Sequence, residues 1–239
     1  MFSQKLNRPI ALVAAAIAVG GGAYGIIGAT AGNGSGTATT ASSSSATSGQ
    51  PVSGRGGSNA RSGPAAGGSI GTVDNVSKSS FTLSTSAGQK VTVKKVSSTT
   101  YKNGTTPTSA SAIKRGETVL ALGTTNGTTI TASQVIVQPN GSAGSATFPV
   151  TAVVPFQQGA PSTSKQDGQI PATYSQGSGT IVSGTKAYKA TKAALAVYPG
   201  GIVDRVVKLS SGEYEVHNIG VSWPHHIFVN QNFKVVGAN

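Results

Sequence analysis

The chain has 239 residues with 33 glycines and 5 % aromatic residues, and only 10 % of it is charged, against about 25 % in an ordinary globular domain. Its 18 lysines and arginines stand against six acids, which gives a formal net charge of +12, and it contains no cysteine. This composition excludes disulfide frameworks, thiol nucleophiles and thiolate zinc sites, and so few carboxylates leave little room for acid–base catalysis.

An apolar segment at residues 10–30 follows two basic residues, Lys5 and Arg8. As a helix it would span roughly 32 Å, enough to cross a hydrocarbon core of about 30 Å. Because the positive-inside rule keeps Lys5 and Arg8 in the cytoplasm, the chain beyond residue 31 is expected outside the membrane. We therefore predict a signal anchor or single-pass transmembrane helix within residues 1–31. The alternative is a signal peptide cleaved near Ala31, which would make the protein secreted.

Residues 32–69 are rich in glycine, serine and alanine and contain no aromatic residue. Such a segment cannot bury enough apolar surface to offset the entropy lost on ordering it. The composition therefore predicts a disordered linker between the membrane segment and the first folded module.

Residues 70–138 alternate between apolar and polar positions, which predicts short β-strands. We expect five of them, at residues 71–76, 81–85, 91–96, 118–122 and 130–137. Turn signals separate them, and the strongest is Asn126-Gly127, a typical hairpin turn. Five short strands in one unit are typical of a small, partly open barrel or of a sandwich.

The same segment resembles a family of exported bacterial β modules. The resemblance rests on Gly71, Gly88, Gly116 and Gly123 and on the pair Ala132-x-x-Val135. It implies an OB-like barrel over residues 70–138, in a family without an assigned function.

The β module carries seven basic and two acidic residues, a net charge of 7 − 2 = +5. Nucleic acid is nevertheless not an expected partner, because base stacking needs several aromatic platforms and the module offers only Phe81 and Tyr101. Weak electrostatic contact with an anionic wall polymer or with lipid headgroups fits the charge better.

Residues 139–184 are predicted to be a second linker. A possible edge strand lies at residues 147–156, although Pro149 and Pro155 argue against a central strand there.

The last segment, residues 185–239, predicts an α+β domain. Residues 185–198 place most of their apolar side chains on one helical face and Lys186, Lys189 and Lys192 on the other. Pro199 and two glycines end the helix. Strands are expected at residues 202–208, 213–219, 226–230 and 233–237, so that one helix packs on an antiparallel meander. The chain as a whole is predicted to be mostly β, with this α+β domain at its end.

Residues 186–238 resemble the PepSY-like domains of exported proteins. The resemblance rests on a helix ending in Tyr-Pro-Gly-Gly at 198–201, then Val203-x-x-Val206, then Gly-x-Tyr-Glu-Val at 212–216. It implies a domain that binds or restrains a partner protein, in some contexts a peptidase, without being a catalyst. The sequence departs from the commoner pattern at residues 220–226, where a charged turn is more usual.

The three histidines of the chain, His217, His225 and His226, lie in this last domain. If the strands around them form a hairpin, His217 and His225 share a face, and Glu215 could add a carboxylate ligand to a metal ion. His226, the next residue along an extended strand, is expected to point the other way. Polar residues at strand ends explain the same pattern, so we expect neither a metal nor another cofactor, with His217 and His225 as the candidate ligands if one binds.

Catalysis is not expected, because no serine stands in a nucleophile elbow and no phosphate-binding loop is present. The candidate partner-binding residues are Trp223, Pro224, His225 and His226, since one rigid aromatic can dominate a small interface. The alternative for Trp223 is a place in the core under the meander.

We therefore expect a non-catalytic binding or structural protein of the cell envelope, tethered to the membrane, that engages a protein or peptide through its C-terminal domain. The alternatives are a regulator or inhibitor of a cell-surface peptidase and a weak binder of cell-wall polymer.

Overall fold

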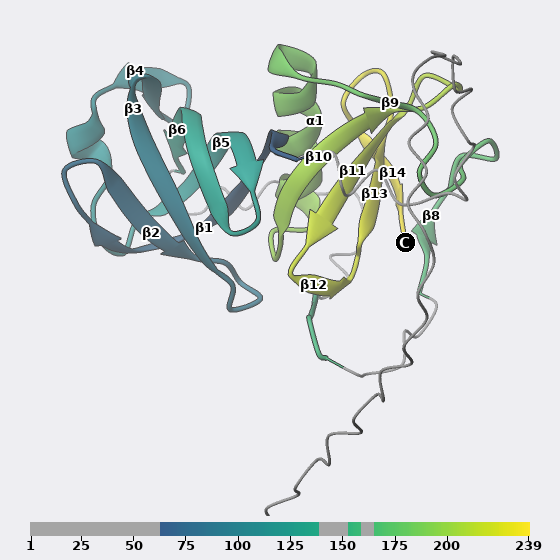
Figure 1. Ribbon diagram of the computed structural model, residues 1–239, viewed down its shortest axis with the longest axis horizontal. Helices are drawn as coiled ribbons and strands as arrows, with labels where there is room; N and C mark the ends of the chain where they lie inside the picture. Colours follow the sequence, from purple (N-terminus) through teal and green to yellow (C-terminus); the bar gives the residue numbers. More distant parts are fainter. Residues whose placement is uncertain (1–62, 139–152, 159–164) are drawn as a thin grey trace, which may run out of the picture. The chain divides into compact units, whose positions relative to one another are not determined.

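A computed structural model of the chain describes residues 63–138, 153–158 and 165–239 (Figure 1). The apolar segment at residues 10–30, with Lys5, Arg8 and Ala31, lies outside the described residues, as does most of the predicted linker. Among the described residues, no helix combines the length and the hydropathy needed to cross a membrane.

The first module consists of five main strands and two short elements. They are β1 (Ala65–Val76), β2 (Ser80–Ser84), β3 (Lys90–Asn103), β4 (Thr106–Thr108), the 3-10 turn η2 (Ala110–Ala112), β5 (Thr118–Asn126) and β6 (Thr129–Val137). The prediction of five strands is confirmed, and three of them, β1, β3 and β5, run well beyond the predicted bounds. β1 begins at Ala65, five residues ahead of the predicted start of the module.

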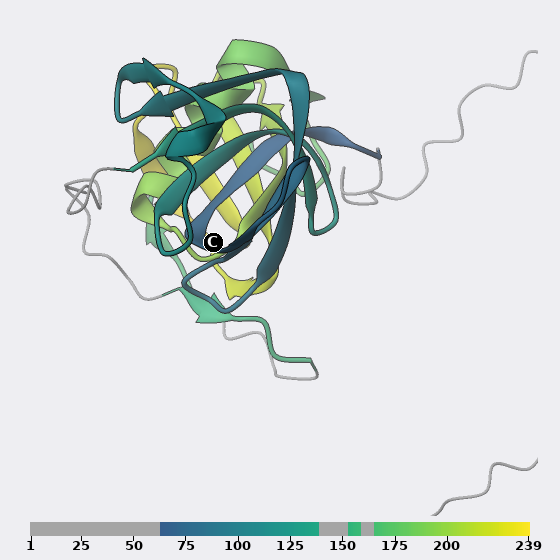
Figure 2. The ribbon, with the colours of Figure 1, turned by 90° about the vertical axis from the view of Figure 1, so that its left-hand side faces the viewer.

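These strands close into a barrel. β2 pairs with β1 and β3, β3 runs parallel to β6, β6 pairs with β5, and β5 returns to β1 (Figure 2). Alternation of side chains along each strand places Phe81, Leu83, Val91 and Val93 inside, each at most 1 % exposed. At Gly71 the backbones approach so closely that a Cβ atom would lie 2.3 Å from the carbonyl oxygen of Ser84, so only glycine fits there.

The second module combines one α-helix with an antiparallel sheet. Its main elements are α1 (Gly184–Val197), β10 (Ile202–Lys208), β11 (Tyr214–Ile219), β12 (Val221–Trp223), β13 (His226–Val229) and β14 (Val235–Ala238). Three two-residue strands accompany them, namely β7 (Val154–Pro155), β8 (Asp167–Gly168) and β9 (Thr180–Ile181). The predicted helix and meander are thereby confirmed, and β7, which pairs with β12, falls in the predicted edge strand.

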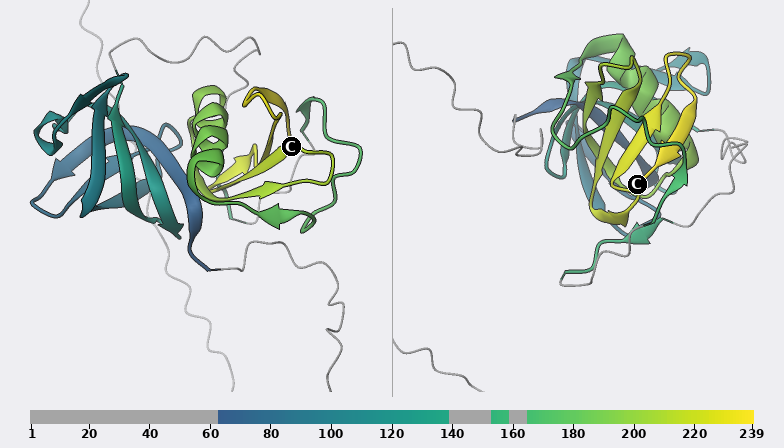
Figure 3. Two further views of the ribbon diagram at one scale, coloured as in Figure 1. Left: turned by 90° about the horizontal axis from the view of Figure 1, so that it is seen from above. Right: turned by 90° about the vertical axis from the view of Figure 1, so that its right-hand side faces the viewer.

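Helix α1 packs through small side chains. Ala187, Ala190 and Ala194 are fully buried at helical spacing, and Lys186, Lys189 and Lys192 are exposed on the other face, as the sequence predicts. Because alanine lets the backbones approach closely, the helix fits between the C-terminal sheet and the outer side of the barrel (Figure 3). One apolar cluster includes Leu195 of α1, Val206 of β10 and Leu120 of β5.

The opposite face of the C-terminal sheet is covered by the segment that precedes α1. Tyr174 and Ile181 from this segment pack on Phe228 of β13 and Val207 of β10. The same segment covers the sheet edges, because β8 pairs with β14 and β9 pairs with β10. One end of this covered face is apolar, and the other end holds the polar cluster described below.

A single strand pairing joins the two modules. Gly68 and Ser69 of β1 pair with Val203 and Ile202 of β10, so one sheet runs from the barrel into the second module. Two buried hydroxyls reinforce the joint: Ser69 donates to the carbonyl oxygen of Gly201 at 2.9 Å, and Thr85 donates to that of Gly200 at 2.8 Å. The described residues consequently belong to one compact unit.

Candidate functional site

The polar cluster lies on the face of the C-terminal sheet that turns away from α1. Three neighbouring strands, β10, β11 and β13, supply it. Its members are Asp204, Arg205, Glu215, His217, His225 and His226.

A β-bulge in β10 brings Asp204 into this cluster. The pairing between β10 and β11 shifts register between Val203 and Arg205, so Asp204 and Arg205 together oppose His217. A bulge of this kind re-aims a side chain that regular alternation would send elsewhere. As a result, Nδ1 of His217 lies 2.6 Å from Oδ1 of Asp204.

A second irregularity, at the start of β13, brings the histidines together. The backbone N–H groups of His225 and His226 both donate to the carbonyl oxygen of Asn239, at 2.8 and 2.9 Å. Two successive N–H groups that point the same way break the strand alternation, so His225 and His226 do not lie on opposite faces.

The prediction that His226 points away from His217 is therefore wrong. His226 is the register partner of His217 across the β11–β13 ladder, and the rings of His225 and His217 are 4.3 Å apart between centroids. One ring nitrogen from each of the three histidines lies within 4.8 Å of the other two.

Two of the three imidazoles are held by carboxylates. His217 contacts Asp204, and Nδ1 of His226 lies 2.7 Å from Oε1 of the buried Glu215. Because an ionised carboxylate only accepts hydrogen bonds, Nδ1 carries the hydrogen in both rings. In the neutral imidazole, Nε2 then keeps its lone pair free for a ligand.

His225 differs from the other two histidines in its surroundings. Burial, followed by the charges of the neighbouring His217 and His226, lowers its pKa to about 4. The His225 ring is therefore neutral at neutral pH, which is the state in which an imidazole can coordinate a cation.

The remaining charges of the cluster nearly balance. Arg205 is 2 % exposed, and its Nη1 atom lies 3.6 Å from Oδ2 of Asp204. Apart from the histidines, the cluster holds two acids, Asp204 and Glu215, and one basic residue, Arg205. An imidazole nitrogen that carries a lone pair binds a cation and not an anion.

The donor set also defines the class of cation. Imidazole nitrogens suit Zn²⁺, Cu²⁺ and Ni²⁺, whereas Mg²⁺ and Ca²⁺ prefer oxygen ligands. In a tetrahedral site with metal–nitrogen bonds of about 2.0–2.1 Å, two ligand nitrogens lie roughly 3.3 Å apart. The histidine nitrogens here are separated by up to 4.8 Å, so the most distant two must approach each other by roughly 1.5 Å when an ion binds. A change of side-chain torsion at the partly exposed His225 can supply a movement of that size.

The candidate partner-binding residues are mostly buried. Trp223 is 5 % exposed, donates its Nε1–H to the carbonyl oxygen of Lys165 at 2.8 Å, and meets the ring of Tyr198 edge to face. Pro224 and His226 are buried as well, and His225 is partly exposed. Trp223 thus lies in the core, which was the predicted alternative, and a role of these residues in partner binding stays a prediction.

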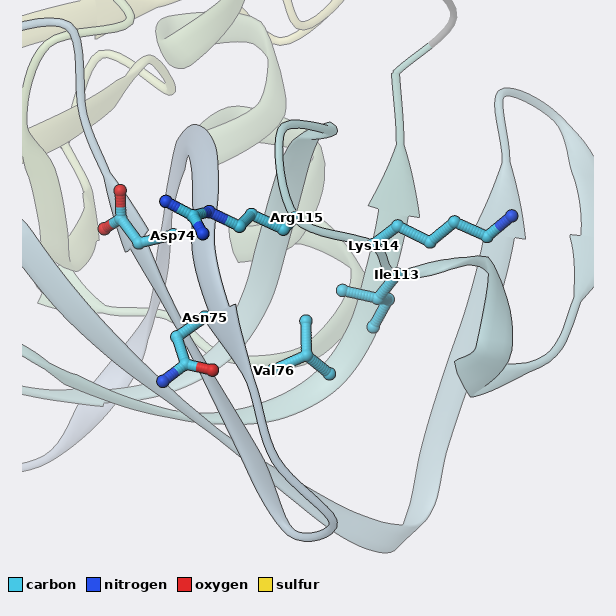
Figure 4. Close-up of a pocket in the computed structure, with 6 residues that line it drawn as sticks. All are labelled: Asp74, Asn75, Val76, Ile113, Lys114 and Arg115. Atoms are coloured by element: carbon cyan, nitrogen blue, oxygen red, sulfur yellow. The ribbon is translucent and has the colours of Figure 1, made fainter.

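A shallow hollow on the barrel carries no comparable constellation (Figure 4). It lies between the end of β1 and the loop before β5, where Arg115 extends toward Asp74 and Lys114 points away. The Asp74 carboxylate is already engaged, since it accepts hydrogen bonds from Ser84 and from Lys90 at 2.8 and 2.9 Å. The hydrogen bond from Lys90 is the largest cause that lowers the pKa of Asp74.

The sequence suggested part of the histidine cluster and missed its carboxylates. It named His217 and His225 as candidate ligands and Glu215 as a possible third, but it gave no role to Asp204. The signal that was available is weak: Asp204 is one of only six acids in the chain and lies on a strand next to a basic residue.

Comparison of the chain with protein-family models, with curated proteins and with solved structures gives no match. The five-stranded barrel, and the single helix on a meander, are therefore properties of this structure rather than of a recognised relative. The PepSY-like resemblance of residues 186–238, and the partner or peptidase binding that it implies, stay predictions from the sequence.

Proposed function

We propose that this chain binds a divalent transition-metal ion and is carried on the outer side of a membrane. The observation that supports metal binding is the meeting of three imidazoles, from β11, from β13 and from His225 just before β13, with a nitrogen of each within 4.8 Å of the others. The proposed location follows from Lys5, Arg8 and the apolar segment at residues 10–30, which the sequence alone supplies.

Metal titration of the purified full-length chain tests this proposal. After treatment with a chelator, isothermal calorimetry with Zn²⁺, Cu²⁺ and Ni²⁺ is expected to show one site per chain. His217→Ala and His226→Ala are expected to weaken binding by more than the 10- to 100-fold that is typical for the loss of an outer-shell group.

The chain is well suited to this test, because it contains three histidines in all and no cysteine that could replace a lost ligand. Ser222→Ala, an exposed position on the neighbouring strand β12, is the matched control and is expected to bind like the wild type. Circular dichroism identifies any variant that fails to fold. A wild-type chain that binds none of the three ions at micromolar concentration contradicts the proposal.

A second candidate function, contact with an anionic wall polymer, is favoured by the charges of the barrel. The barrel carries seven basic side chains. Within the described residues, Lys90 is the one among them that forms an ion pair, with Asp74 at 2.9 Å. Cations such as Lys94 and Lys114 therefore remain available for a polyanion. Co-sedimentation with isolated wall polymer is expected at low salt and is expected to be lost in high salt, because screening weakens exposed charge pairs.

A further inference from the structure

We infer that the ion is coordinated by three histidine nitrogens alone, with Asp204 and Glu215 outside the coordination sphere and the fourth position open to a small exogenous ligand. This inference rests on the metal binding proposed above and specifies its chemistry. Among the described residues, the side chains close enough to share one ion are His217, His225 and His226, and neither acid belongs to this group.

Asp204 acts as a positioning residue for His217. Its Oδ1 atom is engaged at 2.6 Å by Nδ1 of His217, and the bulge in β10 places the two side chains opposite each other. A carboxylate that accepts the Nδ1–H fixes both the tautomer and the orientation of the imidazole, as it does around many metal-bound histidines. His217 then offers Nε2 to the ion.

Glu215 acts in the same way on His226. The two residues lie on neighbouring strands, Glu215 is 1 % exposed, and Oε1 lies 2.7 Å from Nδ1 of His226. Glu215 lies outside the group of side chains whose ligand atoms are close enough to share one ion. The geometry therefore assigns to Glu215 a positioning role in place of the ligand role expected from the sequence.

The third ligand, His225, lies on the accessible side of the cluster. It is partly exposed, and Asp204, whose charge acts on His225, has 18 % of its side chain exposed. The opposite side is closed by the Tyr174 ring, whose centroid lies 5.7 Å from that of His226. Water and small solutes therefore reach the ion from the His225 side.

Three protein ligands and an accessible side define an open centre. Structural zinc sites are closed by four protein ligands, whereas sites with three keep one position for water or an added ligand. On this basis the ion is exchangeable, and its fourth position is expected to accept a small anion. Arg205, itself a member of the cluster, acts electrostatically on His225 and adds positive charge that favours such a ligand.

Conservative and truncating variants of the two acids separate positioning from ligation. Asp204→Asn and Glu215→Gln keep an oxygen that accepts the Nδ1–H, so each is expected to lower metal affinity by less than about 10-fold. Asp204→Ala and Glu215→Ala remove that oxygen and are expected to lower it by about 10- to 100-fold. If either acid were a ligand, its amide variant would lose as much affinity as its alanine variant. Glu117→Gln, on the barrel, is the matched control.

Two readouts use the wild-type chain and so do not depend on whether a variant folds. Azide added to the Co²⁺-loaded chain is expected to shift the visible absorption bands, because it occupies the open position. Nitrogen-15 NMR of the metal-free chain is expected to show the hydrogen on Nδ1 in His217 and His226.

The possible results distinguish this inference from the proposed function. If the wild-type chain binds no transition metal, the proposed function fails. If it binds metal but azide leaves the Co²⁺ spectrum unchanged, or if the amide variants lose as much affinity as the alanine variants, metal binding stands and the open three-histidine centre is overturned.

Discussion

His217 on β11 and His226 on β13 are direct partners across one antiparallel ladder, and the Nδ1 atom of each lies within hydrogen-bond distance of a different carboxylate. Directly opposed residues of an antiparallel pair have Cβ atoms about 4.5–5.5 Å apart, which is close enough for two imidazoles to share one ion. Two bulges complete the arrangement, because one turns Asp204 toward His217 and the other adds His225. The candidate site thus depends on strand register more than on any local motif.

Metal binding is expected to stabilise the folded chain. A ligand that binds only the folded state at about 100 times its dissociation constant adds about 2.7 kcal/mol to the free energy of unfolding. Thermal unfolding of the full-length chain with Zn²⁺ is expected to show a raised midpoint that a chelator returns to the metal-free value. An equal increase in the His217→Ala variant would show that the ion binds elsewhere.

Trp223 is expected to contribute to stability as a core residue. Its side chain is 5 % exposed, packs on Tyr198 and donates a hydrogen bond to the backbone of Lys165. Trp223→Ala is therefore expected to lower the free energy of unfolding by about 3–5 kcal/mol, as measured by urea denaturation followed by circular dichroism.

Phe156 provides the matched aromatic control for Trp223. It is 61 % exposed, so Phe156→Ala is expected to change stability by no more than about 0.5 kcal/mol. Equal losses in the two variants would contradict the placement of Trp223 in the core.

The two modules are expected to unfold together. Because β1 pairs with β10 and buried hydroxyls cross the joint, unfolding of one module exposes apolar surface of the other. Trp223 is the sole tryptophan of the chain and reports on the second module, whereas far-UV circular dichroism reports on both. We expect the two urea transitions to coincide.

The hydroxyl of Ser69 tests the same joint. Ser69→Ala leaves the carbonyl oxygen of Gly201 without its donor and is expected to cost about 1–2 kcal/mol. Ser109→Ala, which removes an exposed hydroxyl of the barrel, is expected to change stability by no more than about 0.5 kcal/mol. Two separate transitions in the wild-type chain would show that the modules are independent.

Stability is expected to fall at high pH through Tyr198. Burial, then the charge of Asp167, raises the pKa of Tyr198 to about 12, against about 10 in the unfolded chain. Between these values the folded state keeps a proton that the unfolded state has lost. The contribution of Tyr198 is therefore complete below pH 10 and is lost as the pH rises toward 12.

The full shift of the Tyr198 pKa corresponds to a loss of about 2–3 kcal/mol in the free energy of unfolding between pH 10 and pH 12. Urea denaturation between pH 9 and pH 12 is expected to show a shallower loss of stability in Tyr198→Phe than in the wild type. Identical slopes in the two proteins would contradict the raised pKa.

The sequence predicted the strands whose side chains alternate strongly. Phe81 and Leu83, like Val91 and Val93, stand at every second position, and burial on one face is the physical reason for that period. The start of β1 at Ala65 was outside the prediction, because a run of alanine, glycine and serine carries no alternation. That run becomes a strand through its pairing with β5 and β10, and both partners are distant in the sequence.

In the candidate site, too, the sequence predicted what regular strand alternation determines and missed what distant contacts decide. The adjacent positions of His225 and His226 predicted opposite faces, because alternation assumes a regular strand. Hydrogen bonds from both residues to Asn239 remove that regularity, and the chain carries Asn239 thirteen residues beyond His226. A bulge has no signature in the pattern of polar and apolar residues, so the sequence could not place His225 and His226 on one face or turn Asp204 toward His217.

By itself, the sequence determined the main strands and the helix of both modules and the scarcity of acids, six in the whole chain. Periodicity and composition are local properties, and each residue carries them wherever it lies. The tertiary structure alone decided the closure of the barrel, the joint between β1 and β10, and the meeting of three histidines with two carboxylates. These depend on register between strands up to more than a hundred residues apart, which is set by packing of the whole chain.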